Sequence, residues 1–305
     1  MHIISELQNY TPERGTLLTI GVFDGVHLGH QHLIETLCSR AAAKNLLCGV
    51  VTFSRHPRAV LLPQTTMARL TTLEERTTLF KNLGVDLVVP IPFDSEVAAL
   101  SAREFVTMLQ KHLRMQGLVI GPDFALGRGR EGNVVALKAL GQELGFTVEV
   151  VGPLMVGEQM ASSTAIRQAL SRGDMETTSK LLGRHFSLSG TVVGGRERGQ
   201  TLGYPTANLE VDSEHALPAD GVYATRSHIG DTVYKSVTNI GMRPTFNERE
   251  RTIEVFLLDF TRNIYGEELT IDIVERLRGE MKFADSGELV AQIDKDVERA
   301  KELLE

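Results

Sequence analysis

Residues 17–30 have the sequence LLTIGVFDGVHLGH, and this stretch decides how the first half of the chain folds. Its apolar start predicts a β-strand over 17–22, and the spacing after it predicts an α-helix over 31–44. Glycine and aspartate between the two predict a tight turn at the carboxyl end of the strand, where open parallel sheets hold ligands. The stretch therefore predicts a strand–turn–helix unit with a ligand site at its turn.

His27 and His30 are three positions apart at the start of this predicted helix, so they share one face. A helix N-terminus adds free backbone N–H groups and a partial positive charge, and glycines let a ligand approach the backbone. A single histidine is usually an ordinary surface residue, but a pair flanking Gly29 favours a phosphate site with imidazole donors. The candidate catalytic residues here are His27 and His30, and the candidate binding residues are Gly21, Phe23, Asp24 and Gly25.

Strand and helix patterns alternate as far as residue 151, which predicts a doubly wound parallel α/β sheet. Further strands are expected at 46–53, 85–91, 118–121 and 146–151, and further helices at 71–83, 101–113 and 134–144. Two helix starts carry the pattern of a capping box, at Thr71–Glu74 and at Ser101 with Glu104.

After a helical connector at 173–183, alternating strands separated by glycine-rich turns replace this pattern. They are expected at 186–193, 209–211, 221–227, 232–238, 253–258 and 269–274, followed by a helix at 286–304. Six strands without an intervening helix predict a small antiparallel six-stranded β-barrel with a C-terminal helix. The predicted domains are residues 1–184 and 185–305.

Composition excludes several classes of protein. The formal net charge of −7 disfavours a broad nucleic-acid-binding surface, and no apolar run is long enough to span a bilayer. The N-terminus lacks the pattern of a signal peptide, so a cytoplasmic protein without a nucleic-acid or membrane partner is expected. Cys38 and Cys48 have neither CxxC nor metal-site spacing and are predicted to be reduced, largely buried thiols.

Three further segments of the first half carry polar or basic groups. His56 lies in residues 53–58, which follow the second strand. This segment either contacts phosphate or the edge of a ring, or is an ordinary exposed loop. Asp123 and Phe124 follow the fourth strand at the same edge of the sheet. Residues 127–132 match G-x-G-x-x-G, but they do not open the first βαβ unit, so a flexible basic loop is expected rather than a dinucleotide site.

The segment SSTAIR at 162–167 places hydroxyls and an arginine at a helix start. Ser163 and Thr164 can cap that helix or bind phosphate oxygens, and Arg167 adds a planar cation suited to a triphosphate. Alone this is a plain helix cap, but together with the histidine turn it favours a phosphate clamp. No Walker A pattern is present, so ATP use must rest on these elements.

The second half contains GQTLGYPTAN at 199–208, a glycine-flanked loop that leads into an extended segment. Side chains alternate in an extended chain, so the oxygens of Thr206 and Asn208 share a face and suit Mg²⁺ bound with nucleotide phosphates. An ordinary turn is the alternative. Glu254 lies in an apolar strand on the same face as Phe256, either as a solvent-face residue or as a general base.

These motifs resemble known families. GVFDGVHLGH resembles the HxGH motif of the nucleotidyltransferase superfamily, and SSTAIR resembles its second phosphate-binding motif, with Ala165 where arginine is frequent. FSRHP and GPDFALG resemble loops of bacterial FMN adenylyltransferase modules. The resemblance implies catalytic roles for His27, His30 and Arg167.

The second half resembles riboflavin kinase through its PTAN signature. That resemblance implies Mg²⁺ on Thr206 and Asn208, a catalytic base at Glu254 and phosphates covered by the loop from Gly199 to Gly203. Residues that follow the kinase pattern, and are therefore expected to contact ligands, are Asn239, Arg243 and Arg278.

Both resemblances, in this order, are those of the bifunctional bacterial riboflavin kinase/FMN adenylyltransferases. They imply ATP-dependent phosphorylation of riboflavin to FMN, then adenylylation of FMN to FAD with release of pyrophosphate. Two alternatives stay open on sequence grounds. In the first, one module has become a regulatory flavin- or nucleotide-binding domain; in the second, the first half transfers a nucleotide to a non-flavin phosphate.

Overall fold

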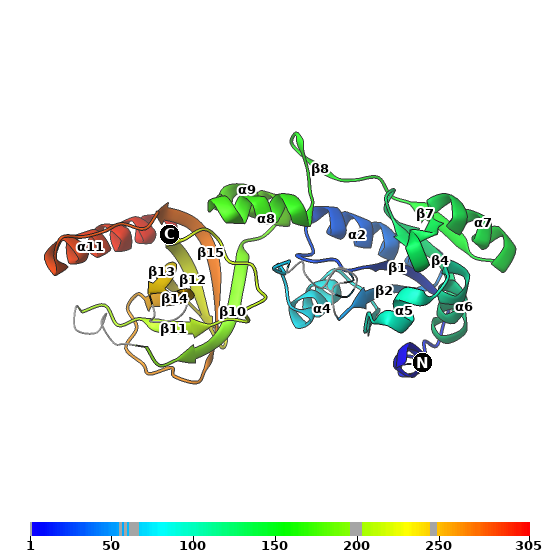
Figure 1. The fold of residues 1–305 in the computed structure, drawn as a ribbon, viewed down its shortest axis with the longest axis horizontal. Coiled ribbons are helices and arrows are strands. Elements are labelled where there is room, and N and C mark those ends of the chain that lie inside the picture. The colour runs from blue at the N-terminus through cyan, green and yellow to red at the C-terminus, as the bar shows by residue number, and fades with distance from the viewer. Residues whose placement is uncertain (1, 55–56, 58–59, 61–66, 196–202, 245–248) are drawn as a thin grey trace. The chain divides into compact units, whose positions relative to one another are not determined.

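A computed structural model of the chain describes residues 2–54, 57, 60, 67–195, 203–244 and 249–305. The chain divides into two compact units, Met1–Ser163 and Thr164–Glu305. Figure 1 shows the helices and strands of each.

The first unit is built on a five-stranded parallel sheet in the order β3-β2-β1-β4-β7, which confirms the doubly wound prediction. The strands are β1 (Thr16–Gly21), β2 (Leu47–Phe53), β3 (Leu87–Ile91), β4 (Met115–Ile120) and β7 (Thr147–Val150). β1 pairs with β2 along its whole length, from Thr16↔Leu47 to Gly21↔Thr52. β1 is therefore central, and its carboxyl end lies at the point where the strand order reverses.

Helices cover both faces of this sheet because alternate residues of β1 are buried on opposite sides. Leu18 and Ile20 belong to one core cluster and Leu17 to the other. The first cluster includes residues of α1 (His2–Gln8), α5 (Ser95–Ala99), α6 (Ala102–Leu113) and α7 (Val134–Leu144), and the second includes residues of α2 (Leu28–Ala43) and α4 (Leu73–Asn82). The two short helices α1 and α5 were not predicted from sequence.

Helix caps agree with the sequence at α6 but not at α4. Ser101 and Glu104 form the predicted capping box. At α4 the box is shifted by one residue, because Thr72 is the extended N-cap residue and exchanges hydrogen bonds with Glu75. Thr71 is thereby left free to contact the turn after β1.

The prediction of two reduced thiols is wrong, since Cys38 and Cys48 form a disulfide. Cys38 lies in α2 and Cys48 in β2, and packing of the helix on the sheet brings their Cα atoms to 4.9 Å. That separation lies within the usual range for disulfides. Sequence spacing alone could not reveal the pair, because tertiary packing creates the proximity.

The G-x-G-x-x-G segment is anchored rather than loose, contrary to the expected flexible loop. It forms a short 3₁₀ helix, Arg128–Arg130, between β5 (Ala125–Leu126) and β6 (Gly132–Asn133). The backbone N–H of Arg128 donates to the carbonyl oxygen of Leu100 at 2.7 Å. A Cβ at Gly127 would lie 2.6 Å from the backbone nitrogen of Ala102, so this glycine permits close packing on the start of α6.

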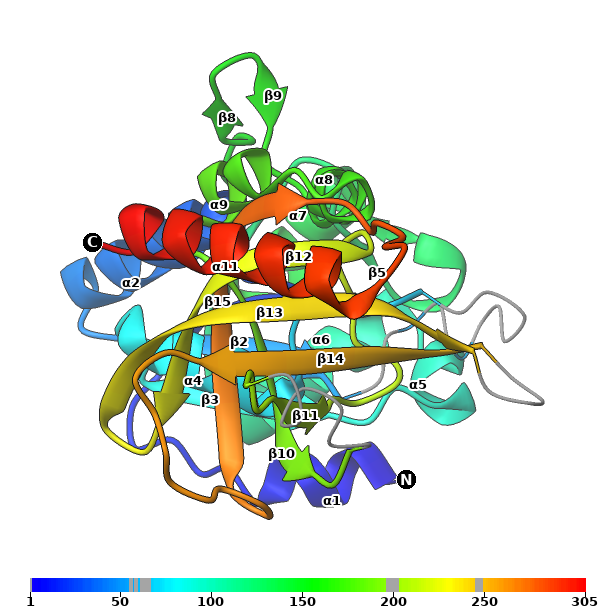
Figure 2. The same cartoon turned by 90° about the vertical axis from the view of Figure 1, so that its left-hand side faces the viewer.

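The second unit contains the predicted six-stranded antiparallel barrel, closed in the order β10-β11-β14-β13-β12-β15. The strands are β10 (Phe186–Val193), β11 (Ala207–Glu210), β12 (Gly221–Ile229), β13 (Thr232–Pro244), β14 (Arg249–Leu257) and β15 (Glu268–Arg278). The C-terminal helix α11 (Ser286–Leu303) lies across β12 and β13, as Figure 2 shows. Val222, Val237 and Ala300 belong to the core between helix and barrel.

Two helices precede the barrel and pack on it. Within α8 (Ser163–Arg172), the carbonyl oxygen of Leu170 accepts a hydrogen bond from the N–H of Ala219 at 2.9 Å. α9 (Met175–Leu182) ends at Gly183, which has the left-handed backbone of the predicted C-cap. This packing explains why the second compact unit begins at Thr164, whereas the sequence divides the domains after residue 184. In the described part of the chain, no helix is long and apolar enough to cross a membrane.

Candidate active sites

The turn after β1 brings the two predicted catalytic histidines together. His27 is the N-cap residue of α2, and its Nδ1 atom accepts a hydrogen bond from the backbone N–H of His30 at 3.3 Å. The imidazole rings stack with centroids 3.6 Å apart, and Phe23 meets the ring of His30 edge-on. The prediction that both side chains share one face at the helix start is confirmed.

The protonation of the two rings follows from this geometry. A neutral His27 whose Nδ1 accepts a hydrogen bond carries its proton on Nε2 and can donate from that atom. Burial holds the pKa of His30 well below its usual value near 6.5, and the electrostatic interactions with the nearby His27 and Arg76 side chains lower it further. His30 is therefore neutral at pH 7.

Gly29 lies close to two of its neighbours. A Cβ at this position would lie 3.1 Å from the His27 ring and 3.1 Å from the carbonyl oxygen of Ala161. Either contact is tighter than a side chain tolerates without movement. The glycine between the histidines thus lets the His27 ring fold back over the helix start.

The remaining turn residues are held by hydrogen bonds inside the unit. Asp24 is buried, and its carboxylate accepts from the backbone N–H groups of Leu70 and Thr71. The N–H of Gly25 donates to Thr71 Oγ1 at 2.9 Å. Ser163 Oγ donates to the carbonyl oxygen of Asp24 at 2.9 Å.

The other candidates of the first half lie in different surroundings. Phe23 is buried in the core, and a Cβ at Gly21 would lie 3.0 Å from its ring. Asp123 and Phe124 follow β4, where the carbonyl oxygen of Asp123 accepts from Arg130. Thr164 and Arg167 follow Ser163 within α8 and belong to the second compact unit. His56 lies outside the described residues.

The second site is organised by a row of residues paired across five strands of the barrel. Asn208 of β11 pairs with Glu254 of β14, and Glu254 pairs with Asn239 of β13. Asn239 pairs with Val222 of β12, which pairs with Arg278 of β15. Side chains of directly paired residues lie on the same face of a sheet. The barrel register therefore aligns four of the predicted site residues.

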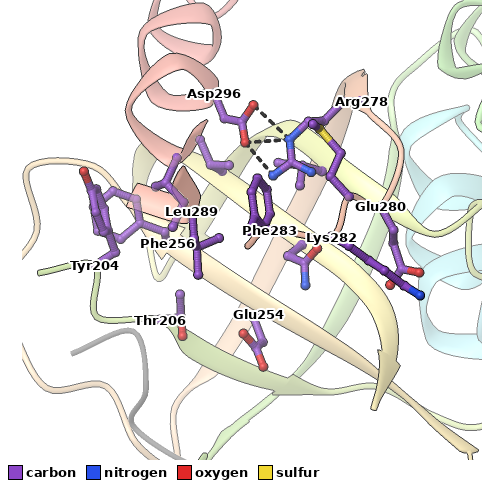
Figure 3. A pocket seen from close by; sticks show the side chains of 15 residues that line it. Tyr204, Thr206, Glu254, Phe256, Arg278, Glu280, Lys282, Phe283, Leu289 and Asp296 are labelled. Atoms are coloured by element: carbon purple, nitrogen blue, oxygen red, sulfur yellow. Dashed lines mark hydrogen bonds and ion pairs between the residues drawn. The ribbon is translucent and has the colours of Figure 1, made fainter. Parts of the chain in front are cut away.

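A pocket of about 690 Å³ opens along this row, between the barrel and α11. Glu254 and Phe256 line it, as the alternation predicts, while Ile253 and Val255 are buried on the opposite face of β14. Figure 3 shows Glu254 and Thr206 on one side of the pocket, with the aromatic rings of Tyr204 and Phe256 beside them. The fifteen lining residues include Asn239, Glu280, Met281, Lys282, Phe283, Leu289 and Ile293.

Thr206 also lines a second pocket, of about 320 Å³. Its other walls include Pro205, Leu257, Phe260, Ile264 and Tyr265. The two pockets thus share one side chain, an alcohol immediately before β11. A molecule in one pocket can meet a molecule in the other at this point.

Asn208, in β11, packs closely against Gly195. A Cβ at Gly195 would lie 2.0 Å from Asn208 Nδ2, so the chain passes directly against this amide. Gly203, in the glycine-rich loop, has a left-handed backbone with φ of 86°. Gly199 lies outside the described residues. Gly195 therefore lies directly against Asn208, one of the two predicted magnesium ligands.

The predicted ligand residue Arg278 lines the pocket, but its guanidinium is paired within the protein. It forms an ion pair with Asp296 of α11 at 2.9 Å, and the two side chains are 17% and 6% exposed. Gln292 donates to the same carboxylate at 2.9 Å. The pair, drawn with dashed lines in Figure 3, fixes α11 as a wall of the pocket. Arg243 lies in β13.

We expect Asp296→Ala to lower the free energy of unfolding of the second unit by about 3 kcal/mol, because it leaves the largely buried guanidinium of Arg278 without its carboxylate partner. The measurement is urea unfolding of the full chain. Glu302→Ala is the matched control on the same helix, since its ion pair with Arg299 is exposed and should change stability by less than about 0.5 kcal/mol. Equal losses in the two variants would contradict the role of the buried pair.

Sequence reasoning missed three residues at these sites. Arg76 is a buried arginine beneath the histidine turn, Asp296 pairs with Arg278, and the Tyr204 hydroxyl donates to Asp294 of α11. All three interactions join segments that are far apart in the chain. The helical spacing that places Asp296 on the inner face of α11 was the one available signal.

Together, a doubly wound unit with stacked histidines after β1 and a barrel with a glutamate-lined pocket define a two-domain transferase. The FAD synthetase family model matches residues 10–165, and the riboflavin kinase model matches residues 182–304. Curated relatives named bifunctional riboflavin kinase/FMN adenylyltransferase include those of Escherichia coli K12 and Bacillus subtilis. The first is 38% identical over 99% of this chain and 97% of its own length, and the second 36% identical over 98% and 94%.

A solved structure also shares the whole fold. It is described as a macrolide-efflux protein from Streptococcus pneumoniae, with a TM-score of 0.90 and 32% identity over 97% of this chain and 96% of its own. The chain belongs to the family of bifunctional riboflavin kinase/FMN adenylyltransferases.

Proposed function

We propose that the chain makes FAD in two ATP-dependent steps, with each step assigned to one of the sites described above. The barrel phosphorylates riboflavin to FMN, and the doubly wound sheet adenylylates FMN. The observation that carries the proposal is the pairing of Asn208 with Glu254 and of Glu254 with Asn239, the last two of which line one pocket, combined with the stacked histidines after β1. Because the product of the barrel is the substrate of the sheet, the two sites form a sequence of reactions.

In the kinase step, the pocket between the barrel and α11 holds the flavin ring. Its aromatic and apolar lining and its volume of about 690 Å³ suit a flat ligand of this size. Glu254 accepts the proton of the riboflavin 5′-hydroxyl as that oxygen attacks the γ-phosphorus of ATP, the bond from the γ-phosphorus to the bridging oxygen breaks, and ADP leaves. Tyr265 and Phe260, in the second pocket, are placed to hold the adenine of ATP. Phosphate transfer then occurs next to Thr206, where the pockets meet.

Mg²⁺ fits this second site as a companion of ATP. The described residues contain no group of three or more His, Cys, Asp or Glu side chains that could hold a metal alone. The alcohol of Thr206 and the amide of Asn208 are hard oxygen donors of the type that complete a magnesium shell begun by phosphates. When bound, Mg²⁺ neutralises the charge of those phosphates during transfer.

In the adenylylation step, a phosphate oxygen of FMN attacks the α-phosphorus of ATP and pyrophosphate leaves. The nucleophile is already an anion, so this step needs charge stabilisation rather than a strong base. His27 and His30 are positioned to donate hydrogen bonds to the transferring phosphate. By the resemblance of SSTAIR, Ser163, Thr164 and Arg167 would bind the departing phosphates.

The assignment of activities to residues 1–184 and 185–305 is part of this proposal. It is supported by the ranges of the two family models, 10–165 and 182–304. Since both steps consume ATP, we propose that the chain acts in the cytoplasm.

Incubation with riboflavin, ATP and Mg²⁺, followed by chromatography of the flavins, tests the two-step function. We expect riboflavin to disappear first, FMN to rise and fall, and FAD to accumulate. Accumulation of FMN without FAD would show that only the barrel is active. Supplying FMN in place of riboflavin tests the first unit separately, and loss of FAD formation there would overturn its assignment.

A further inference from the structure

Arg76, in α4, is the buried cation beneath the histidine turn. Only 5% of its surface is exposed, and its guanidinium donates to three backbone carbonyl oxygens. These belong to Val22, to Phe53 at 3.2 Å and to Thr72 at 3.3 Å. A buried charge is costly unless its donors are satisfied, and here they are used to join the carboxyl ends of β1 and β2.

The turn that Arg76 supports has an unfavourable backbone. Phe23 and Val26 have φ of 54° and 39°, in the left-handed region that side chains rarely occupy, on either side of Gly25 at 82°. Such a backbone conformation is strained and persists only where the surrounding structure imposes it. Val26 is β-branched, so its conformation is especially unfavourable. Contacts with residues outside the turn must therefore maintain its conformation.

These contacts come from residues 70–76, which we term the clamp segment. Its backbone N–H groups at Leu70 and Thr71 bind the Asp24 carboxylate, and Thr71 Oγ1 accepts from the N–H of Gly25. Arg76 binds the carbonyl oxygen of Val22 at the other end of the same turn. The contacts of the clamp segment thus cover the turn from its first residue to its glycine, and His27 follows two residues later.

We propose that Arg76 is a positioning residue for adenylyl transfer, which holds the strained turn in the conformation that stacks His27 on His30. The inference rests on the proposed role of the two histidines. Arg76 touches neither substrate nor reacting atoms and acts through the backbone of Val22 and Phe53. It also places a positive charge close to His30, whose pKa it lowers together with burial and His27. Asp24 and Glu75 are the carboxylates that act on Arg76 itself, and Arg69 is the opposing cation.

Arg76→Lys in the full chain tests the proposal, because lysine keeps the charge but lacks the fork that reaches several carbonyl oxygens. We expect kcat for FAD formation to fall by about 100-fold, the effect of misplacing a catalytic group by roughly 1 Å, with a smaller change in KM for ATP. FMN formation by the barrel should be unchanged, which provides an internal measure of intact protein. NMR signals of the His27 and His30 rings, shifted by their stacking, should move in the variant.

Arg76→Gln separates charge from geometry. The NMR titration of His30 should show a higher pKa in Arg76→Gln and not in Arg76→Lys, a difference that a purely structural role would not produce. Arg40→Lys is the matched control, since Arg40 is an exposed arginine of α2 paired with Glu149, and we expect no change in either activity.

The results that would overturn the proposal are specific. A wild-type rate of FAD formation in Arg76→Lys would do so, as would a lost rate with unmoved histidine signals. If the Arg76 variants unfold the first unit, Thr71→Val decides the matter, because it removes the bond to Gly25 and leaves Arg76 in place. We expect about a tenfold loss there, and an unchanged rate would reject the clamp segment. Full FAD formation by the chain without both histidines would instead reject the proposed function.

Discussion

Replacing His27 and His30 together by alanine should abolish FAD formation and leave FMN formation intact. The stacked rings sit at the N-terminus of α2, where they can present donors to the phosphate that receives charge during transfer. Removal of one preorganised donor of this kind costs about 10²–10³-fold in kcat, so loss of both should exceed about 10³-fold. The measurement is the rate of FAD formation from FMN and ATP, determined by chromatographic separation of the flavins.

His32→Ala is the control for this experiment. His32 lies in the same helix, two residues beyond His30. Its backbone carbonyl oxygen accepts a hydrogen bond from the hydroxyl of Thr36. We expect the control to retain both activities. FAD formation at the wild-type rate in the double variant would show that the histidine turn is not the adenylylation site. Loss of both activities would point instead to a general failure of folding.

Glu254→Gln should reduce riboflavin phosphorylation by about 10²–10⁴-fold, the usual contribution of a positioned general base. Glutamine keeps the size of the side chain and removes its ability to accept the proton. Glu254 lies in the aligned row, with Asn208 on one side and Asn239 on the other. FAD formation from supplied FMN should be unaffected, since the adenylylation site is assigned to the other half of the chain.

Glu275→Gln is the matched control on the barrel, because Glu275 is an exposed residue of β15 that lines neither pocket. We expect its phosphorylation rate to equal that of the wild type. The KM for riboflavin in Glu254→Gln distinguishes chemistry from binding, since loss of a base lowers kcat with little change in KM. Equal kinase rates in Glu254→Gln and wild type would reject Glu254 as the base.

Much of the architecture could be predicted because buried strands leave continuous or alternating apolar runs. β10 and α7 begin and end where the spacing predicts, and the period-two pattern correctly places Glu254 and Phe256 on one face of β14. β13 extends to Pro244, six residues past the predicted end. Those added residues pair with the start of β14, so the partner strand, rather than their own hydrophobicity, maintains the extended conformation.

The site predictions likewise succeeded where they depended on local structure. The proximity of His27 and His30 follows from local helix geometry, so their spacing of three residues was enough to predict it. Asp24 was expected to bind a ligand, yet its carboxylate accepts hydrogen bonds from Leu70 and Thr71, forty-six and forty-seven residues away. Nothing near Asp24 in the sequence could reveal these donors, because they arrive with the start of α4.

The sequence by itself determined the strand–turn–helix unit, the histidine pair, the barrel strands and the face on which Glu254 lies. Each of these depends on the 3.6-residue or two-residue periodicity of neighbouring side chains. Only the tertiary structure decided the barrel register that aligns Asn208 with Glu254, the Cys38–Cys48 disulfide and the burial of Arg76 under a strained turn. These depend on contacts between distant segments, for which local periodicity carries no information.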